Sequence, residues 1–179
     1  MFTTERLRLR AALDSDYENI FKLWNTESVM RGAAASDYVV PRSPGYKEAL
    51  QRMVDKTTMF AIVETKEETP VFIGLTDLHV REPKNRDADF GIMLAPEFWG
   101  KGYGTELTRF MVDYAFVELG LHRVSLGVFS HNVAAIALYK KIGFVEEGRK
   151  RKSTWVGGKW EDFISMGILE DEWAQLKDR

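Results

Sequence analysis

The chain has no cysteine and only five prolines among its 179 residues. The absence of cysteine excludes a disulfide framework, a cysteine-ligated zinc site and a catalytic thiol. Neither sign of charge is in clear excess, with 25 lysines and arginines against 27 aspartates and glutamates, so nothing drives general binding to nucleic acid or anionic lipid. The sequence also lacks an apolar run long enough to span a bilayer or to form a signal peptide. We therefore expect a cytoplasmic protein with no nucleic-acid or membrane partner.

The rest of the composition, 45% hydrophobic and 12% aromatic, is typical of one globular domain covering residues 1–179. Alternating patterns predict strands and 3.6-residue patterns predict helices. The expected strands cover 7–10, 59–66, 71–82, 88–94, 123–129, a stretch from 144 onward, and 160–169. The expected helices follow Asp14-Ser15-Asp16, cover 43–56, follow Gly104, and cover 132–142. This order predicts an α/β fold, a mixed and mostly antiparallel sheet of about seven strands flanked by about four helices. Glycine and proline predict a loop with a broken helix over 25–46, where a substrate could bind.

Three glycines, Gly100, Gly102 and Gly104, lie between an expected strand and an expected helix. Glycines in this position let several backbone N–H groups point at one place, where the helix N-terminus favours an anion such as phosphate. A P-loop is excluded because Gly100-Lys101 is followed by Gly102 rather than by serine or threonine. A dinucleotide fingerprint is excluded because Leu107 stands where its third glycine is needed.

The segment Pro96-Glu97-Phe98-Trp99-Gly100-Lys101-Gly102-Tyr103-Gly104-Thr105-Glu106 resembles the acetyl-CoA loop of the GNAT superfamily of N-acetyltransferases, in the wording of its RimJ/RimL-like branch. Trp99 stands where the family pattern has glutamine or arginine. A second segment, from Asn132 to Phe144, is similar to the family's Asn…Ala…Leu-Tyr…Lys…Gly-Phe helix. Residues 7–10 at the start, and residues 155–160 with Met166 and Leu169 at the end, also look like this branch, so the resemblance covers nearly the whole chain. It implies the GNAT fold and an N-acetyltransferase that uses acetyl-CoA as co-substrate.

The resemblance also implies which residues hold the cofactor. The pantetheine arm would lie along the strand that precedes the glycine loop, and the phosphates would lie in the loop. Asn132 would cap its helix, bond the pantetheine arm, or do both. The expected cofactor-binding residues are Ile92, Met93, Leu94, Trp99, Gly100, Lys101, Gly102, Tyr103, Gly104, Thr105 and Asn132.

Acetyl transfer to an alkylamine requires removal of a proton, because such an amine has a pKa near ~10.4. It also benefits from protonation of the leaving thiolate. The resemblance implies that Tyr139 is the general acid, because it occupies the family's position for that residue. The alternative is that Tyr139 only packs in the core as an aromatic residue. Asp89 is the first choice for the base, with Asp77 and His79 as alternatives, and a surface salt bridge is the competing role for each.

We expect direct attack on acetyl-CoA by a small polyamine-like amine or a protein N-terminus, because no cysteine is present to carry an acyl group. The carboxylates expected around the acceptor are Glu27, Asp37, Glu48, Asp77 and Asp89, opposed by Arg31 and Arg42.

Two other functions remain open. A noncatalytic CoA-binding module would keep the glycine loop without turnover, and a ribosome- or RNA-associated protein would use the basic run from Arg149 to Lys152. The oligomeric state is also open, with a homodimer as an alternative to a monomer. The three histidines, His79, His122 and His131, have no metal-ligand spacing, so we expect no metal.

Overall fold

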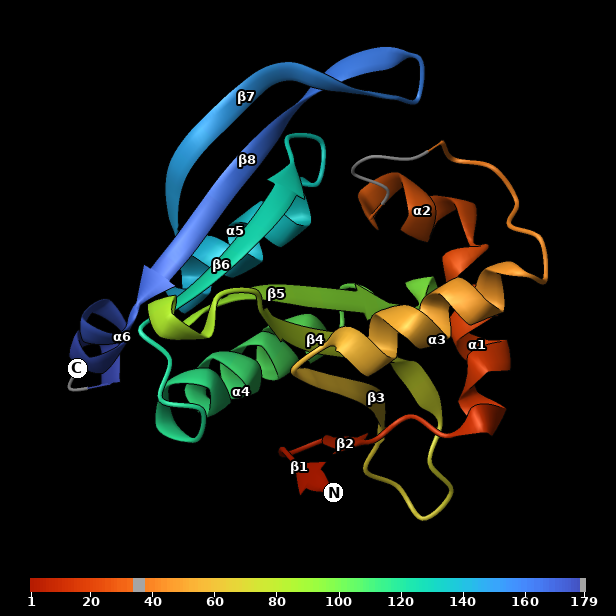
Figure 1. Ribbon diagram of the computed structural model, residues 1–179, viewed down its shortest axis with the longest axis horizontal. Helices are drawn as coiled ribbons and strands as arrows, with labels where there is room; N and C mark the ends of the chain where they lie inside the picture. Colours follow the sequence, from red (N-terminus) through yellow and green to blue (C-terminus); the bar gives the residue numbers. More distant parts are fainter. Residues whose placement is uncertain (34–37, 178–179) are drawn as a thin grey trace.

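One eight-stranded sheet forms the centre of the computed structural model, which describes residues 1–33 and 38–177 (Figure 1). The strands lie in the order β1-β2-β3-β4-β5-β6-β8-β7. Their bounds are β1 Phe2–Thr3, β2 Leu7–Arg10, β3 Met59–Thr65, β4 Phe72–Val80, β5 Asp87–Leu94, β6 Arg123–Phe129, β7 Val145–Val156 and β8 Lys159–Leu169. The mixed, mostly antiparallel sheet predicted from the sequence is confirmed, with one strand more than expected.

A single parallel pair interrupts this sheet. β5 and β6 pair only where Asp87, Ala88 and Asp89 lie opposite Arg123, Val124 and Ser125, whereas all the other neighbouring strands are antiparallel. Beyond that short contact the two strands diverge, and β6 turns away with β8 and β7 while β5 continues beside β4 (Figure 1). The sheet therefore opens into a wedge at its centre.

Six α-helices cover the two faces of the sheet in the described part of the chain. Their bounds are α1 Tyr17–Trp24, α2 Glu27–Ala33, α3 Tyr46–Lys56, α4 Tyr103–Val117, α5 Val133–Ile142 and α6 Glu170–Lys177. One core contains the buried Leu107 and Met111 of α4 with Tyr139 of α5, and the other contains Ile20 of α1 and Leu50 of α3. Thus α4 and α5 lie on one face, and α1 to α3 on the other. No helix in these residues is both long enough and apolar enough to cross a membrane.

The start of α1 differs from the expectation that Asp14-Ser15-Asp16 would cap the helix. These residues form a short 3-10 helix, and no side chain caps α1. The carboxylate of Asp16 is already occupied, because it accepts the backbone N–H of Leu13 at 2.7 Å and two bonds from the guanidinium of Arg10 at 2.6 and 2.8 Å. Arg10 also binds Glu64 on β3, so this network ties β2 to the first helical turn.

Other boundaries also differ from the sequence expectation. The loop with a broken helix predicted over 25–46 contains the short helix α2, whereas α3 begins at Tyr46 rather than at 43. The two-residue strand β1 and the helix α6 were not predicted. In α6, Trp173 donates a hydrogen bond to Asp113 and packs on Phe116, so the helix depends on tertiary contacts that a local pattern does not show.

Candidate functional site

The wedge between β5 and β6 forms a cleft of about 1040 Å³. Its lining comes from both halves of the sheet, from the glycine loop, from α2 and from α5. Ten of the residues predicted to bind cofactor or act as acid line it: Ile92, Met93, Leu94, Trp99, Gly100, Gly102, Gly104, Thr105, Asn132 and Tyr139. The structure thus brings together the two motifs on which the family resemblance rests.

The glycine loop has the backbone geometry that an anion cradle needs. Gly100 and Gly102 have φ angles of 71° and 84°, in the left-handed region that favours glycine. Gly102 is the N-cap of the 15-residue α4, whose first N–H groups have no partner within the helix. Trp99 anchors the other end of the loop, because its indole Nε1 donates a 2.7 Å hydrogen bond to the carbonyl of Leu94 at the end of β5.

Two of the predicted cofactor residues do not line the cleft. The Nζ of Lys101 lies 5.6 Å from the ring centre of Phe98, and the ring of Tyr103 lies beneath the guanidinium of Arg6 at 4.4 Å. Both side chains pack on the outside of the loop. Only the backbone groups of Lys101 and Tyr103 could therefore contact a cofactor in the cleft.

Asn132 connects α5 to the cleft. Its side-chain Oδ1 accepts the backbone N–H of Ala135 at 3.3 Å, which makes it the N-cap of α5. The same side chain lies against Gly32 of α2, where an added Cβ would be 3.6 Å from Nδ2. Asn132 therefore caps a helix and also lines the cavity, as the sequence allowed.

Tyr139 is 8% exposed and lies at the base of the wedge. Its ring makes an edge-to-face contact with Phe90 at 6.4 Å and a tilted contact with Phe144 at 5.8 Å. Burial raises the pKa of the Tyr139 hydroxyl to about 12, so the group is protonated at neutral pH. The side chain both packs in the core and faces the cleft.

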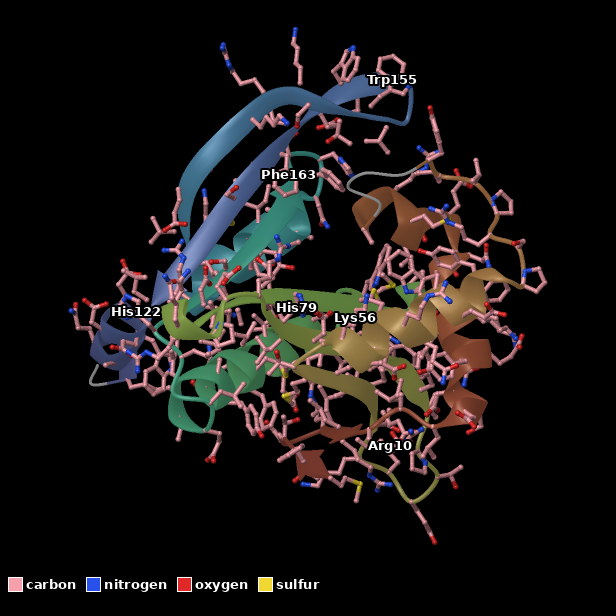
Figure 2. All side chains as sticks on the ribbon, viewed as in Figure 1. Arg10, Lys56, His79, His122, Trp155 and Phe163 are labelled. Carbon is pink, nitrogen blue, oxygen red and sulfur yellow. The ribbon has the colours of Figure 1, made fainter. Side chains whose placement is uncertain are left out.

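The three candidate bases lie on one face of β4 and β5, the face covered by α1 to α3. Asp77 is opposite Gly91 and His79 is opposite Asp89 in the register of the two strands. Asp77 lines the cleft, and burial raises its pKa to about 6, with a smaller lowering by His79 and a raising by Asp89. Asp89 is not part of the cleft lining, and its carboxylate forms a 2.5 Å ion pair with Arg81 at the surface. His79, labelled in Figure 2, is two residues after Asp77 on β4 and is directly opposite Asp89 on β5.

Gly91 is a residue of the cleft to which the sequence analysis assigned no role. The carboxylate of Asp77 occupies the space that a Cβ at Gly91 would need. Gly127 on β6 plays the same part for Phe163 of β8, whose ring lies where a Cβ would project. Isolated glycines within predicted strands can indicate such a close approach, and that was the available signal.

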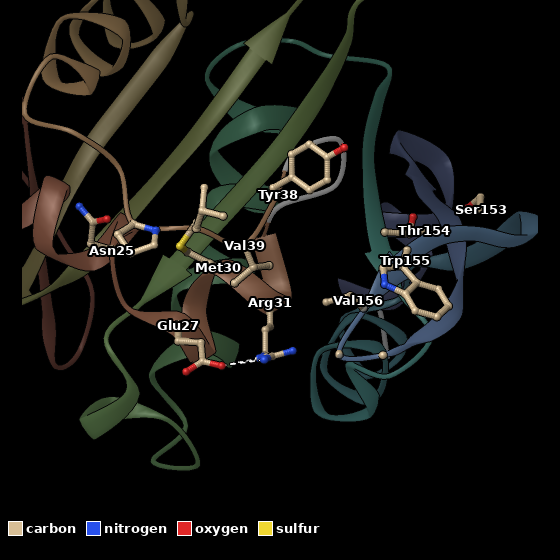
Figure 3. A pocket seen from close by; sticks show the side chains of 14 residues that line it. Asn25, Glu27, Met30, Arg31, Tyr38, Val39, Ser153, Thr154, Trp155 and Val156 are labelled. Carbon is tan, nitrogen blue, oxygen red and sulfur yellow. Dashed lines mark hydrogen bonds and ion pairs between the residues drawn. The ribbon is translucent and has the colours of Figure 1, made fainter.

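A second hollow of about 790 Å³ adjoins the cleft beside α2 (Figure 3). It lies between α2 with residues 38–41 on one side and the β7–β8 hairpin tip, residues 153–158, on the other. Arg31 lines both spaces, and its guanidinium binds Glu27 at 2.6 Å. Glu48 instead lies on α3 beside Arg52 at 3.8 Å, and Asp37 is outside the described residues.

The basic run has partners on its own hairpin. Arg149 binds Glu146 at 2.9 Å and Asp162 at 3.3 Å, and the backbone N–H of Lys152 donates to Asp162 at 2.8 Å. Within residues 1–33 and 38–177, no three histidine, aspartate or glutamate side chains gather where they could hold a metal ion. The expectations of no metal and no nucleic acid remain predictions.

Comparison with known proteins identifies the family. Residues 6–145 match the model described as an acetyltransferase (GNAT) domain. The chain is 36% identical over 106 residues to spermidine N(1)-acetyltransferase of Vibrio cholerae and 38% identical over 104 residues to the putative ribosomal N-acetyltransferase YdaF of Bacillus subtilis. These matches span 59% and 58% of this chain, and 61% and 57% of the relatives' lengths.

The fold extends the likeness over nearly the whole chain. A crystal structure of the Vibrio cholerae spermidine N-acetyltransferase in complex with CoA and spermine superposes with a TM-score of 0.81 at 31% identity. The superposition covers 94% of this chain and 98% of that one. Taken with the family match and the shape of the wedge, this likeness shows that the chain belongs to the GNAT family of N-acetyltransferases.

Proposed function

We propose that this chain transfers the acetyl group of acetyl-CoA to a primary amine by direct attack within a ternary complex. One observation carries the proposal: the glycine cradle, Tyr139 and Asp77 all line a single cleft that opens through the sheet. In the reaction the amine nitrogen bonds to the acetyl carbon and the carbon–sulfur bond breaks. An ammonium first gives up one proton to become the neutral amine, which then loses a second proton as the CoA sulfur gains one, so the step is balanced with one proton released and no acyl-enzyme.

The donor side is the part of the cleft formed by β5, α4 and α5. Beyond Asp89, the edge of β5 that faces β6 has no strand partner, so an extended pantetheine arm could lie along residues 92–94 there. The carbonyl of Leu94 on this stretch already accepts the indole N–H of Trp99. The phosphates would lie at residues 99–105, where left-handed glycines precede the N-terminus of α4. The related crystal structure is a complex with CoA, which supports CoA as the donor molecule.

Tyr139 is the proposed acid. A free thiol has a pKa of about 8.5, below that of the buried phenol, but the burial that raises the pKa of Tyr139 would also raise that of a thiolate beside it. The phenol can therefore donate as negative charge develops on the sulfur.

Asp77 is the proposed acceptor of the amine proton, in place of our first choice, Asp89. Among the described lining residues of the cleft, Asp77 is the only carboxylate. With a pKa of about 6, Asp77 is ionised at neutral pH. Its pKa is also nearer to that of the amine than the pKa of an ordinary aspartate is, which makes it a stronger base. Asp89 and His79 continue the row on the same face toward the surface, where Asp89 meets Arg81, so the proton has titratable neighbours on its way out.

The acceptor is proposed to be a polyamine-like small molecule or an exposed N-terminal amine that enters past α2. The relatives support both, because one is named a spermidine acetyltransferase and another a putative ribosomal acetyltransferase. The CoA and spermine bound together in the related structure make spermidine and spermine the first acceptors to test. A cytoplasmic location, expected from the sequence, remains a prediction.

The test is to incubate the protein with acetyl-CoA and a panel of amines while following free thiol. The panel contains spermidine, spermine, simple diamines, aminoglycosides and peptides with free N-termini, with an acceptor-free reaction as blank. Amine-dependent thiol release is expected for at least one class. CoA binding with no release across the panel would instead support the noncatalytic module.

A further inference from the structure

Arg6 connects the start of the chain to the glycine loop, although the two are 95 residues apart in sequence. It stands immediately before β2, next to residues 7–10, whose resemblance to the family came with no assigned role. Its Nη1 donates a 3.0 Å hydrogen bond to the carbonyl of Lys101, and its guanidinium lies 4.4 Å above the ring of Tyr103. The side chain therefore contacts the loop on its outer side, away from the cleft.

The contact with Lys101 fixes the direction of a neighbouring N–H group. In a planar trans peptide the C=O and the following N–H point in opposite directions. Because Arg6 holds the Lys101 carbonyl toward itself, the N–H of Gly102 points away from Arg6. Lys101 lies between two left-handed glycines, which by themselves would leave this peptide unusually free to rotate.

Arg6 also neutralises a carboxylate at the start of α4. Glu106, in the first turn of the helix, accepts the Nε of Arg6 at 2.7 Å and its backbone N–H at 2.8 Å, and it accepts the hydroxyl of Thr4 at 2.5 Å. An unpaired carboxylate there would repel a phosphate at the same helix N-terminus and compete for its N–H groups. The three bonds draw the charge to the outer side of the helix.

We propose that Arg6 is a positioning residue for the phosphates of acetyl-CoA. It does so by orienting the Lys101–Gly102 peptide and by sequestering the charge of Glu106. The inference rests on the proposed function only in taking CoA as the molecule that the loop binds. It gives the N-terminal segment a role in cofactor recognition that the sequence did not assign.

The proposal is tested by calorimetric binding of two probes, CoA and pantetheine, because pantetheine lacks the phosphates. Arg6→Ala is expected to raise the Kd for CoA about 10- to 100-fold, the range for loss of a charge-assisted bond, and to leave the Kd for pantetheine unchanged. Arg6→Lys keeps the charge but cannot bridge both partners, so a smaller loss is expected. Arg8→Ala is the matched control, since Arg8 is a nearby arginine, two residues further along on β2, and reaches the carbonyl of Glu67 instead of the loop.

A folded Arg6→Ala protein with parental affinity for CoA would overturn the proposal, and so would an equal loss for CoA and pantetheine, which indicates general damage to the cleft. If Arg6→Ala does not fold, the double variant Arg6→Lys with Glu106→Ala is compared with Arg6→Lys alone. Removing the carboxylate should recover part of the CoA affinity that Arg6→Lys loses. A double variant that recovers no affinity would contradict the role given to the charge of Glu106. A parental protein that binds no CoA would instead refute the proposed function itself.

Discussion

Tyr139 combines two properties at the scale of a single residue: its ring packs against Phe90, and its hydroxyl is protonated at neutral pH. Tyr139→Phe keeps the ring contacts and removes only the hydroxyl. We expect kcat to fall about 10- to 10⁴-fold, the usual range for loss of a general acid, with the Kd for acetyl-CoA unchanged. Single-turnover rates measure the first quantity and calorimetry the second. A parental rate under conditions where chemistry limits turnover would reduce Tyr139 to a packing residue.

Asp77 illustrates what the sequence could and could not predict about the site. Period-2 alternation correctly placed Asp77 with His79, and Asp89 with Gly91 and Met93, on their strand faces. It could not show which acid lies at the cleft, because that depends on where β5 leaves β6 and on the space above Gly91. Those features arise from strands that are distant in the sequence.

Ionisation of Asp77 is expected to lower the stability of the fold while it supports activity. Its pKa is about 6 in the fold against 3.8 for an ordinary aspartate, so the native state holds a proton that the unfolded chain has released between these pH values. The free energy of unfolding therefore falls as pH rises through that window, and the ionised carboxylate destabilises the fold at neutral pH. Asp77→Asn should raise the free energy of unfolding at pH 7.5 by about 1 to 2 kcal/mol, a discounted value for a group beside an open cleft, and change it little at pH 4.

The same substitution should lower kcat/KM, and the activity of the parent should decline below about pH 6 as Asp77 takes up its proton. Denaturant titrations at the two pH values and a pH–rate profile provide the measurements, with Asp89→Asn as the comparison on the same face. A variant that is less stable at pH 7.5, or fully active, would contradict the role given to Asp77.

At the scale of elements, the glycine loop and the start of α4 form one unit whose backbone does the binding. Gly102→Val places a β-branched side chain at a φ of 84° and beside Arg6. Gly120→Val is the matched control, because Gly120 is also left-handed, with a φ of 58°, but has open space around it and lies past the other end of α4. Both should cost about 1 to 2 kcal/mol of stability through backbone strain.

Only Gly102→Val should also weaken CoA binding, by about tenfold or more. Fluorescence or calorimetric titration with CoA distinguishes the two variants. Equal affinities in both would show that the loop is a turn and not a phosphate site.

The elements that the sequence predicted well are those whose pattern is local and long. The helix after Gly104 and the helix from Asn132 carry apolar spacing, a glycine or an asparagine cap, and clear ends, and both lie as expected. α6, which was not predicted, depends on partners far along the chain, because Asp113 and Phe116 hold it in place.

At the scale of the whole molecule, the proposed reaction would place the two substrates on different faces of the sheet. The proposed donor side lies with α4 and α5 and the proposed acceptor side with α1 to α3, and the cleft between β5 and β6 has lining residues from both. Such an arrangement favours direct transfer, and the chain has no cysteine to hold an acyl group. We expect the intact mass of the protein to be unchanged after incubation with acetyl-CoA alone, and initial-rate plots to intersect as for a ternary complex. A stable acetylated protein that passes its acetyl group to an amine would contradict this mechanism.

The most direct test of the central claim is the stoichiometry between released thiol and acetylated amine. Parental protein is incubated with acetyl-CoA and spermidine, or with whichever amine is active in the panel. Both products are quantified in the same reaction, free thiol by a colorimetric assay and acetylated amine by mass spectrometry. We expect one acetylated amine for each thiol released, and no thiol above background without the amine. Thiol release without acetylated amine, or no reaction with any amine despite bound CoA, would contradict the assignment of this cleft as an N-acetyltransferase site.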